Sequence, residues 1–344
     1  IVILVFSRYY LHREKGYKRF FNNLKFFYLG LMTVLLANNL EVLFVGWEIL
    51  GVTSFFLIGF YRERYLPVKN ALKVVSLYRV ADVSLLLGVW VCHHYFGHSM
   101  NFHEVTGLEN AQAHMMNNGF YAYFIPALFL IAAMVKSAQI PFSSWLPRAM
   151  EGPTTSSAIF YGALSVHIGV FLLIRTAPYW EDNLIFHVII GAIGIATCIV
   201  ATLIARVQSS VKTQIAYSSI AQIGIMFLEV ALGWHMLAVA HFAGNALLRT
   251  HQLLISPSVL SYRIHDQFFH FSPPAVQKTN GFINKLKLSM YVLSIKEFNL
   301  DAFMRRLLWN PIKKAGKLFG FMNEKTTYII ALPIFLMGLY GVYN

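Results

Sequence analysis

Residues 40–61 read LEVLFVGWEILGVTSFFLIGFY, an almost continuous apolar run that has Glu41 at its start and a second carboxylate, Glu48, near its centre. A helix needs about 20 mostly apolar residues to cross the hydrocarbon of a bilayer. This stretch is long enough, so it predicts a membrane-spanning helix. The Asn38-Asn39 pair directly before it predicts a tight turn from the preceding apolar segment.

The same length test applied outward along the chain finds further apolar runs at 24–37, 73–96, 119–138, 154–174, 184–206, 214–232, 235–260 and 327–343. Only 12% of the 344 residues are charged and 57% are hydrophobic, whereas a soluble domain carries about 25% charged residues. We therefore predict an all-α polytopic transmembrane helix bundle with eight or nine spans. The Ile1 start, already apolar and without Met, indicates that the sequence begins inside a helix.

Lys and Arg gather in alternate gaps between the runs. Residues 8–25 hold six and residues 62–73 hold four, whereas residues 97–118 hold none. Short basic loops stay on the cytoplasmic side of a membrane. We therefore predict that these gaps lie on the cytoplasmic or equivalent side of a bacterial inner membrane or another energy-coupling membrane. The net charge of +13 follows the loops rather than one folded face, so it predicts contact with the lipid bilayer and no nucleic-acid binding.

The residues after 260 form a distinct, more polar region. We divide the chain into a bundle at 1–260, a cytoplasmic-side segment at 261–326 with eleven Lys and Arg, and a C-terminal transmembrane helix at 327–344. Residues 300–318 separate apolar from basic positions at helical spacing, which predicts an interfacial amphipathic helix lying along the membrane. An ordinary soluble tail is the alternative.

Two of the ionisable residues inside the spans are the sharpest candidates, because an unpaired charge there costs several kcal/mol. They are Glu48 and Lys136, and their opposite charges predict a proton-handling pair buried from lipid. Lys136 begins the stretch KSAQIPFSSWLPRAMEGPTTSSA (136–158), whose three prolines predict a discontinuous helix that breaks near Ile140. The alternatives are that Glu48 forms a salt bridge that only holds two helices together, and that Lys136 extends its ammonium group to the basic membrane interface.

A second polar set lies on the run 235–260. His241, Asn245 and Arg249 recur every four residues, and Gln252 is close to the same stripe. Polar side chains are unfavourable against lipid, so this stripe is predicted to face other helices or a hydrated channel.

Two further residues are weaker candidates. Lys212 precedes the run at 214–232 and could be a simple marker of the basic side. His167 lies in the run 154–174, where a single His is as often a packing residue as a proton relay.

Four strings resemble a known family: FVGWEILGVTSFFLIGFY (44–61), NALKVVSLYRVAD (70–82), KSAQIPFSSWLPRAMEGPTTSSA (136–158) and QSSVKTQIAYSSIAQIGIMF (208–227). The family is that of proton-conducting, antiporter-like membrane subunits. It includes the largest such subunit of NADH:quinone oxidoreductase (complex I), Mrp-type antiporter subunits and the membrane subunit of inorganic-carbon uptake complexes. The resemblance is nearly collinear and covers roughly residues 6–250.

The resemblance implies roles for several residues. Glu48 and Lys136 would be the glutamate and lysine pair of the family, Lys212 its central lysine and His241 a family histidine, which together form the expected proton pathway. A secondary polar axis is expected from Lys73, Arg79, Asp82, Tyr161, His167, Asn245 and Arg249. Tyr161 occupies a position that the family usually fills with His.

The chain also departs from the family pattern. Asn245 stands where a His is usual and Arg249 where a Lys is usual. Arginine effectively never loses its proton, so a proton is expected to pass from Lys136 toward Lys212 and His241 and to stop near Arg249. Because the tail is too polar to supply the family's later spans, the sequence indicates a divergent or truncated member.

We therefore expect a proton-translocating subunit of a multisubunit complex, assembled with other membrane subunits and possibly a soluble one. The alternative is the membrane subunit of an inorganic-carbon (bicarbonate or CO2) uptake complex partnered with a zinc-containing, carbonic-anhydrase-like protein. No nucleotide loop, paired Cys motif or haem pattern occurs, so no cofactor and no redox site are expected in this chain. A metal transporter would need the histidines of the 93–114 region, whose spacing fits no zinc pattern.

Overall fold

The computed structural model describes residues 2–97, 101–107, 119–163, 165–270, 281–318, 320 and 329–337. Within these ranges the regular structure is helical. The helices of the first half are α1 (Val2–Tyr10), α2 (Tyr17–Leu36), α3 (Leu40–Ile58), α4 (Tyr65–Phe96), α5 (Phe102–Gly107), α7 (Gly119–Lys136), α8 (Trp145–Arg148) and α9 (Thr154–Ser157). Those of the second half are α10 (Ile168–Arg175), α11 (Leu184–Val207), α12 (Val211–Ala231), α13 (His235–His270), α14 (Phe282–Ile295), α15 (Leu300–Met304) and α16 (Asn310–Leu318).

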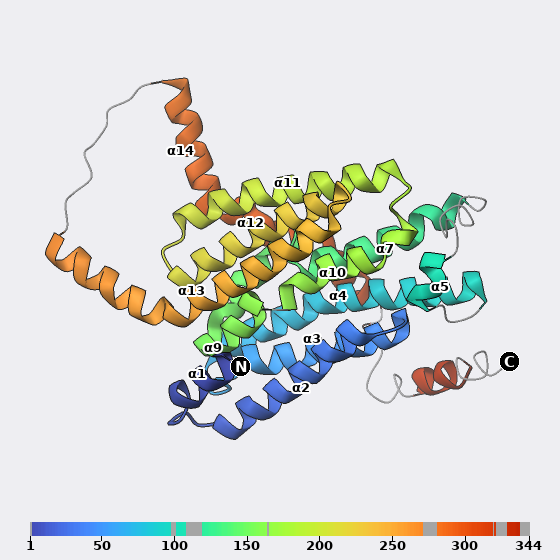
Figure 1. Cartoon of the computed structure of the whole chain (residues 1–344), viewed down its shortest axis with the longest axis horizontal. Coiled ribbons are helices and arrows are strands. Elements are labelled where there is room, and N and C mark those ends of the chain that lie inside the picture. The colour runs from blue at the N-terminus through green and yellow to red at the C-terminus, as the bar shows by residue number, and fades with distance from the viewer. Residues whose placement is uncertain are drawn as a thin grey trace. The chain divides into compact units, whose positions relative to one another are not determined.

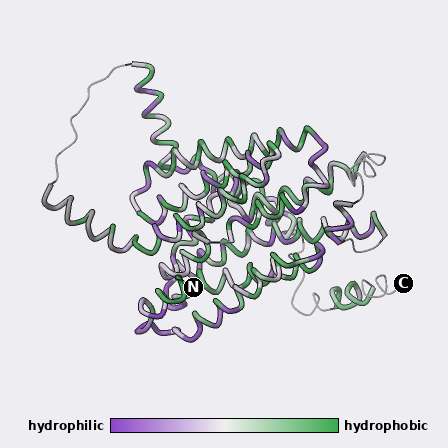
Figure 2. The backbone as a smooth tube through the Cα atoms, viewed as in Figure 1, coloured by the Kyte–Doolittle hydropathy of each residue, from purple (hydrophilic) through white to green (hydrophobic). Residues whose placement is uncertain are grey.

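The chain divides into two compact units, 1–298 and 299–344. In the first unit the long helices lie side by side (Figure 1): α3 packs between α2 and α4, α7 between α4 and α10, and α12 between α11 and α13. The polytopic helical bundle predicted from the sequence is confirmed. Figure 2 shows that its long helices are predominantly hydrophobic, as a bilayer requires.

Six helices of the described part are long and apolar enough to span a membrane: α3, α4, α7, Thr154–Arg175, α11 and α12. The other two predicted runs in the bundle form α2 and α13, which pack beside α3 and α12 but carry more polar residues. α13 also continues to His270, through the predicted boundary at residue 260. The division at 260 stays a prediction, and half of the predicted span 327–344 lies outside the described residues.

Local chemistry explains the turn before α3. α2 ends at Leu36, and Asn39 takes the N-cap position of α3, where its side-chain oxygen accepts a hydrogen bond from the backbone N–H of Val42 at 2.9 Å. Such a cap satisfies one of the N–H groups that the first turn of a helix leaves without a partner. The turn expected from the Asn38-Asn39 pair is confirmed.

The predicted discontinuous helix near Lys136 is also confirmed. α7 ends at Lys136 and the chain continues through short helical pieces before α10 begins. The Val135 carbonyl, which a continuing helix would have used, instead accepts a hydrogen bond from the indole Nε1 of Trp145 at 2.9 Å, and the Ile140 N–H donates to Thr197 Oγ1 at 3.1 Å. Non-helical backbone at this depth is tolerated because the surrounding protein satisfies it.

Two pairs of neighbouring helices touch through glycine. A Cβ atom added to Gly46 of α3 would lie 2.7 Å from the backbone nitrogen of Val34 in α2, and one added to Gly224 of α12 would lie 2.6 Å from the Gly194 oxygen in α11. Both contacts are with backbone, which cannot rotate away. Glycine is therefore required where α2 meets α3 and where α11 meets α12.

The second unit is helical from Leu300 to Leu318, in α15, a single-turn π-helix at Arg305–Trp309 and α16. Residues 329–337 form one further helical piece. The helix predicted at 300–318 is confirmed as a helix, and its location along the membrane stays a prediction.

Candidate functional site

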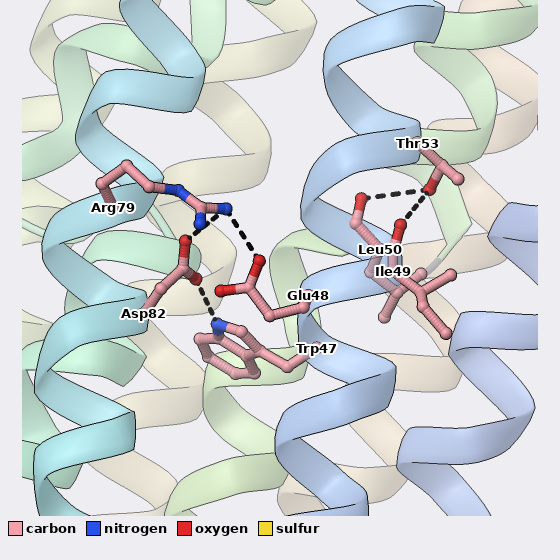
Figure 3. A network of polar contacts seen from close by, with 7 residues as sticks. All are labelled: Trp47, Glu48, Ile49, Leu50, Thr53, Arg79 and Asp82. Atoms are coloured by element: carbon pink, nitrogen blue, oxygen red, sulfur yellow. Dashed lines mark hydrogen bonds and ion pairs between the residues drawn. The ribbon is translucent and has the colours of Figure 1, made fainter. Parts of the chain in front are cut away.

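A cluster of charged residues joins α3 to α4 (Figure 3). The Arg79 guanidinium lies 2.8 Å from Glu48 Oε2 and 2.9 Å from Asp82 Oδ2, so one cation bridges two carboxylates. The other oxygen of Asp82 accepts a hydrogen bond from the indole Nε1 of Trp47 at 2.8 Å. Asp82 is almost fully buried, whereas the side chain of Arg79 is 49% exposed on the surface of the chain.

Lys136 lies beside this cluster and is fully buried. Its ammonium nitrogen stands 4.2 Å from the centre of the Tyr78 ring and 4.7 Å from that of Trp47. Within the described residues it has no hydrogen-bond acceptor. The negative charge of the neighbouring cluster comes from Asp82 and Glu48.

Glu48 and Lys136 were predicted to pair directly or through one water, and among the described residues they form no direct ion pair. Glu48 forms its ion pair with Arg79, and two aromatic rings take the place of a carboxylate at the Lys136 ammonium. The reason is that α4 packs against both α3 and α7 and brings Arg79 to Glu48. The burial expected of Lys136 is confirmed, and its role in carrying protons stays a prediction.

Polar groups continue from Lys136 across the broken helix. The next residue, Ser137, donates a hydrogen bond from its hydroxyl to the Val166 carbonyl at 2.6 Å. Val166 is followed by His167, which is buried and whose Nε2 lies 3.0 Å from the amide Nδ2 of Asn245 in α13. His167, a weaker candidate in the sequence, thus lies one residue after the carbonyl that Ser137 contacts.

His241 has polar partners on both sides of its ring. Its Nδ1 lies 2.8 Å from a Glu229 carboxylate oxygen and its Nε2 lies 2.9 Å from Gln222 Oε1. Both neighbours are acceptors on α12, so the doubly protonated ring would satisfy both with N–H donors. Sequence reasoning missed Glu229, although the rule that singled out Glu48, an acid inside an apolar run, would have found it.

Arg249 is held by neutral groups. Its guanidinium donates to Asn245 Oδ1 at 3.2 Å, to Gln252 Oε1 at 2.7 Å and to the Ser218 carbonyl at 3.2 Å. The stripe predicted on α13 is confirmed, since His241, Asn245 and Arg249 all turn toward other helices.

Lys212 is not adjacent to His241. It is the second residue of α12, whereas His241 bonds to Gln222, which is ten residues, or about 15 Å, farther along that helix. The carboxylate that acts on Lys212 is Glu151, which accepts a hydrogen bond from Asn70 Nδ2 at 3.3 Å. Arg249 contacts α12 at Ser218, so it lies between Lys212 and His241 rather than beyond them.

The remaining predicted residues fall elsewhere. Lys73 lies half-buried on α4, one turn after Asn70. The side chain of Tyr161 lies outside the described residues, as do His98 and His114, and the described residues contain no group of acids, Cys and His that could hold a metal ion. An ion pair absent from the sequence reasoning joins Arg148 of α8 to Glu297 at 2.8 Å.

Comparison with known proteins identifies the family of this chain. The family described as NADH:quinone oxidoreductase/Mrp antiporter, transmembrane, matches residues 37–298. NADH-quinone oxidoreductase subunit L of Buchnera aphidicola is 34% identical over 259 residues, covering 75% of this chain and 41% of that protein. NADH-ubiquinone oxidoreductase chain 5 of Petromyzon marinus is 35% identical over 267 residues, covering 77% and 43%.

The fold has a solved counterpart. A chain in the structure of the Mrp complex from Dietzia sp. DQ12-45-1b superposes with a TM-score of 0.67 at 23% identity, covering 86% of this chain and 34% of that one. This likeness concerns the fold alone. The chain spans about two fifths of the length of the curated relatives described above.

Proposed function

Because the chain belongs to the NADH:quinone oxidoreductase/Mrp antiporter membrane family, we propose that it carries protons across a membrane as the antiporter-like subunit of a multisubunit complex. The observation that supports this most is the Lys136 ammonium, which is fully buried, without an acceptor in the described part and beside two carboxylates. Burial disfavours the charged form of lysine and carboxylates favour it. Lys136 is thus placed where a small rearrangement changes whether it holds its proton.

Arg79 is the group that could make that change. It shares Asp82 and Glu48 with Lys136, and unlike lysine it stays charged. When Arg79 holds both carboxylates tightly, less negative charge is left to stabilise the Lys136 ammonium. Movement of Arg79 away from them would favour proton uptake by Lys136, and its return would favour release.

The released proton is proposed to follow the polar groups at Ser137 and His167 toward His241. Arg249 does not accept the proton, because a guanidinium has no basic site at physiological pH. Glu229 and His241 form the next pair that can exchange a proton, at the far end of α12 from Lys212. Lys212 and Glu151 would serve a separate branch toward the other end of that helix.

A partner membrane subunit is proposed to cover Arg79. This residue is fifteenth of the 32 in α4, near the middle of the helix, and half of its side chain is exposed. A charge at that depth is costly against lipid. Contact with another subunit would remove the free-energy cost of exposing this charge to lipid. It would also allow that subunit to influence the Lys136 site through Arg79. The basic turns are assigned to the cytoplasmic or equivalent side by the positive-inside rule.

The test is proton transport by the complete complex reconstituted in vesicles, monitored with a pH-sensitive dye. Lys136→Ala should abolish transport, and Lys136→Arg should impair it because guanidinium cannot release the proton. Lys69→Ala, an exposed lysine near the start of α4, is the matched control and should leave transport unchanged. Normal transport by the Arg variant in an intact complex would show that Lys136 supplies only a fixed charge.

Identifying the proteins that copurify with the chain tests the assembly. Redox or antiporter subunits are expected. Recovery of a zinc-containing, carbonic-anhydrase-like protein instead would support inorganic-carbon uptake and contradict the proposed assembly.

A further inference from the structure

A polar cavity of about 470 Å³ lies between the α1–α2 turn and the α3–α4 turn. Figure 2 shows the α1–α2 turn as one of the hydrophilic parts of the first unit. It is lined by Arg13, Glu14, Lys15, Gly16, Arg19, Phe60, Tyr61, Arg62, Glu63 and Arg64.

The lining carries unbalanced positive charge. Five of its side chains are cationic and two are acidic, a net charge of +3. None of the five cations forms an ion pair within 4.0 Å in the part of the chain that the structure describes. Charges held close together without counterions repel one another, so the arrangement favours an anion from outside the chain.

Two of the guanidinium groups are fixed in place. Arg19 donates a hydrogen bond to the Phe60 carbonyl at 3.0 Å and stands over the Phe60 ring, and Arg64 stands 4.6 Å from the centre of the Tyr61 ring. Gly16 makes room for Arg19: its φ is +102°, and a Cβ there would lie 2.9 Å from the guanidinium. Specific contacts thus orient Arg19 and Arg64, and four of the five cations, Arg13, Lys15, Arg62 and Arg64, are exposed and accessible to a ligand.

The cavity lies at the membrane interface. The apolar span α3 ends at Ile58, and the lining begins two residues later. Along α3, Val45, Val52 and Phe56 are exposed and lie on one face that leads to the cavity. An apolar stripe that ends in a cationic cavity at this depth matches an amphiphile with an anionic head.

We propose that this cavity binds the phosphate headgroup of an anionic phospholipid, with the acyl chains along the exposed stripe of α3. Arginine is suited to phosphate because its planar donors bind two oxygens at once. Burial raises the pKa of the Tyr61 hydroxyl, and the Glu14 carboxylate adds to this effect. Tyr61 therefore keeps its proton and can donate a hydrogen bond to a phosphate oxygen. Basic pockets on the cytoplasmic side of membrane proteins bind such headgroups.

The experiment compares two double variants of the full chain in its complex. Arg62→Gln with Arg64→Gln removes two cations of the cavity, whereas Lys18→Gln with Lys69→Gln removes two exposed cations outside it. Native mass spectrometry measures phosphatidylglycerol bound in the presence of excess phosphatidylcholine. The cavity variant should bind roughly thirty-fold more weakly, at about 1 kcal/mol for each cation removed, and the control should bind like the wild type. Equal loss in both variants would show nonspecific surface charge and overturn the proposal.

Two measurements on the wild type keep the test decisive if a variant does not fold. Hydrogen exchange of residues 11–20 and 60–65 should slow in nanodiscs that contain phosphatidylglycerol and remain fast in phosphatidylcholine alone; no difference would overturn the proposal. Inorganic phosphate at millimolar concentration should not displace the lipid. Displacement of phosphatidylglycerol by inorganic phosphate would identify a site for the free anion instead and also overturn the lipid assignment.

Discussion

Replacing Lys136 with Met separates its proposed function from structural support. The change forfeits two cation–π contacts, worth about 2 kcal/mol each in a desolvated site. It also removes a buried charge whose desolvation costs several kcal/mol. The two contributions oppose each other, and Asp82 keeps its bonds to Arg79 and Trp47. We therefore expect the free energy of unfolding to change by no more than about 2 kcal/mol while proton transport is lost.

Arg79→Met is the informative comparison. It leaves the carboxylates of Glu48 and Asp82 without the cation that bridges them. Breaking a buried ion pair costs about 3–5 kcal/mol, and the lower end applies because Arg79 is half-exposed. The Arg79 variant should therefore be less stable than the Lys136 variant.

The assays for this comparison are denaturant unfolding, followed by helical circular dichroism, and dye-monitored proton uptake by the reconstituted complex. Lys69→Met controls for loss of a lysine. The reasoning is refuted if Lys136→Met unfolds more easily than Arg79→Met, or if it transports protons at the wild-type rate.

Further predictions concern other parts of the chain. Gly224→Ala should lower the free energy of unfolding by about 1–3 kcal/mol because its Cβ meets backbone of α11, whereas Gly244→Ala, with nothing within 4 Å, should be neutral or slightly stabilising in a denaturant titration. Glu229→Gln removes the charged partner of His241 and should slow proton transport about tenfold, since hydrogen bonds to charged groups contribute about 1.5–3 kcal/mol; an unchanged rate would exclude the pair from the pathway. Trp309, within the C-terminal amphipathic helix, should be quenched by lipids brominated near the headgroup and much less by lipids brominated at the chain end.

Much of the fold could be predicted because bilayers constrain sequence strongly. Apolar runs of sufficient length marked the helices, and the prolines at 141, 147 and 153 located the break after Lys136. Asn39 revealed the start of α3 because caps need a side-chain acceptor. The observed boundaries of α2 and α13 differ from the predicted ones, because polar residues lie inside these helices. Packing against neighbouring helices sets the composition there.

The partners within the site were harder to predict. A charge in an apolar run stands out in the sequence, but the residue that meets it depends on how two helices rotate against each other. Arg79 and Tyr78 are adjacent in sequence, yet one reaches Glu48 and the other packs against Lys136. No periodicity in α4 alone distinguishes these two contacts.

The order of residues along α12 and α13 could have been predicted from the sequence. The connection between these helices is short, residues 232–234, so they run antiparallel. Residues near the connection must then pair with each other, which brings Glu229 to His241 and leaves Lys212 at the opposite end. The resemblance placed Lys212 and His241 on one axis without giving this order.

The glycine contacts between helices have a mechanical consequence. Sliding α12 along α11 by one residue moves it about 1.5 Å, which would drive other side chains into the backbone where only Gly194 and Gly224 now fit. The same restriction applies to α2 and α3 at Gly46. Each pair of helices is therefore expected to move as one rigid body. The segment after α7, which is broken into short helical pieces, lies between these helix pairs along the chain. We therefore expect a conformational change to concentrate there, next to Lys136.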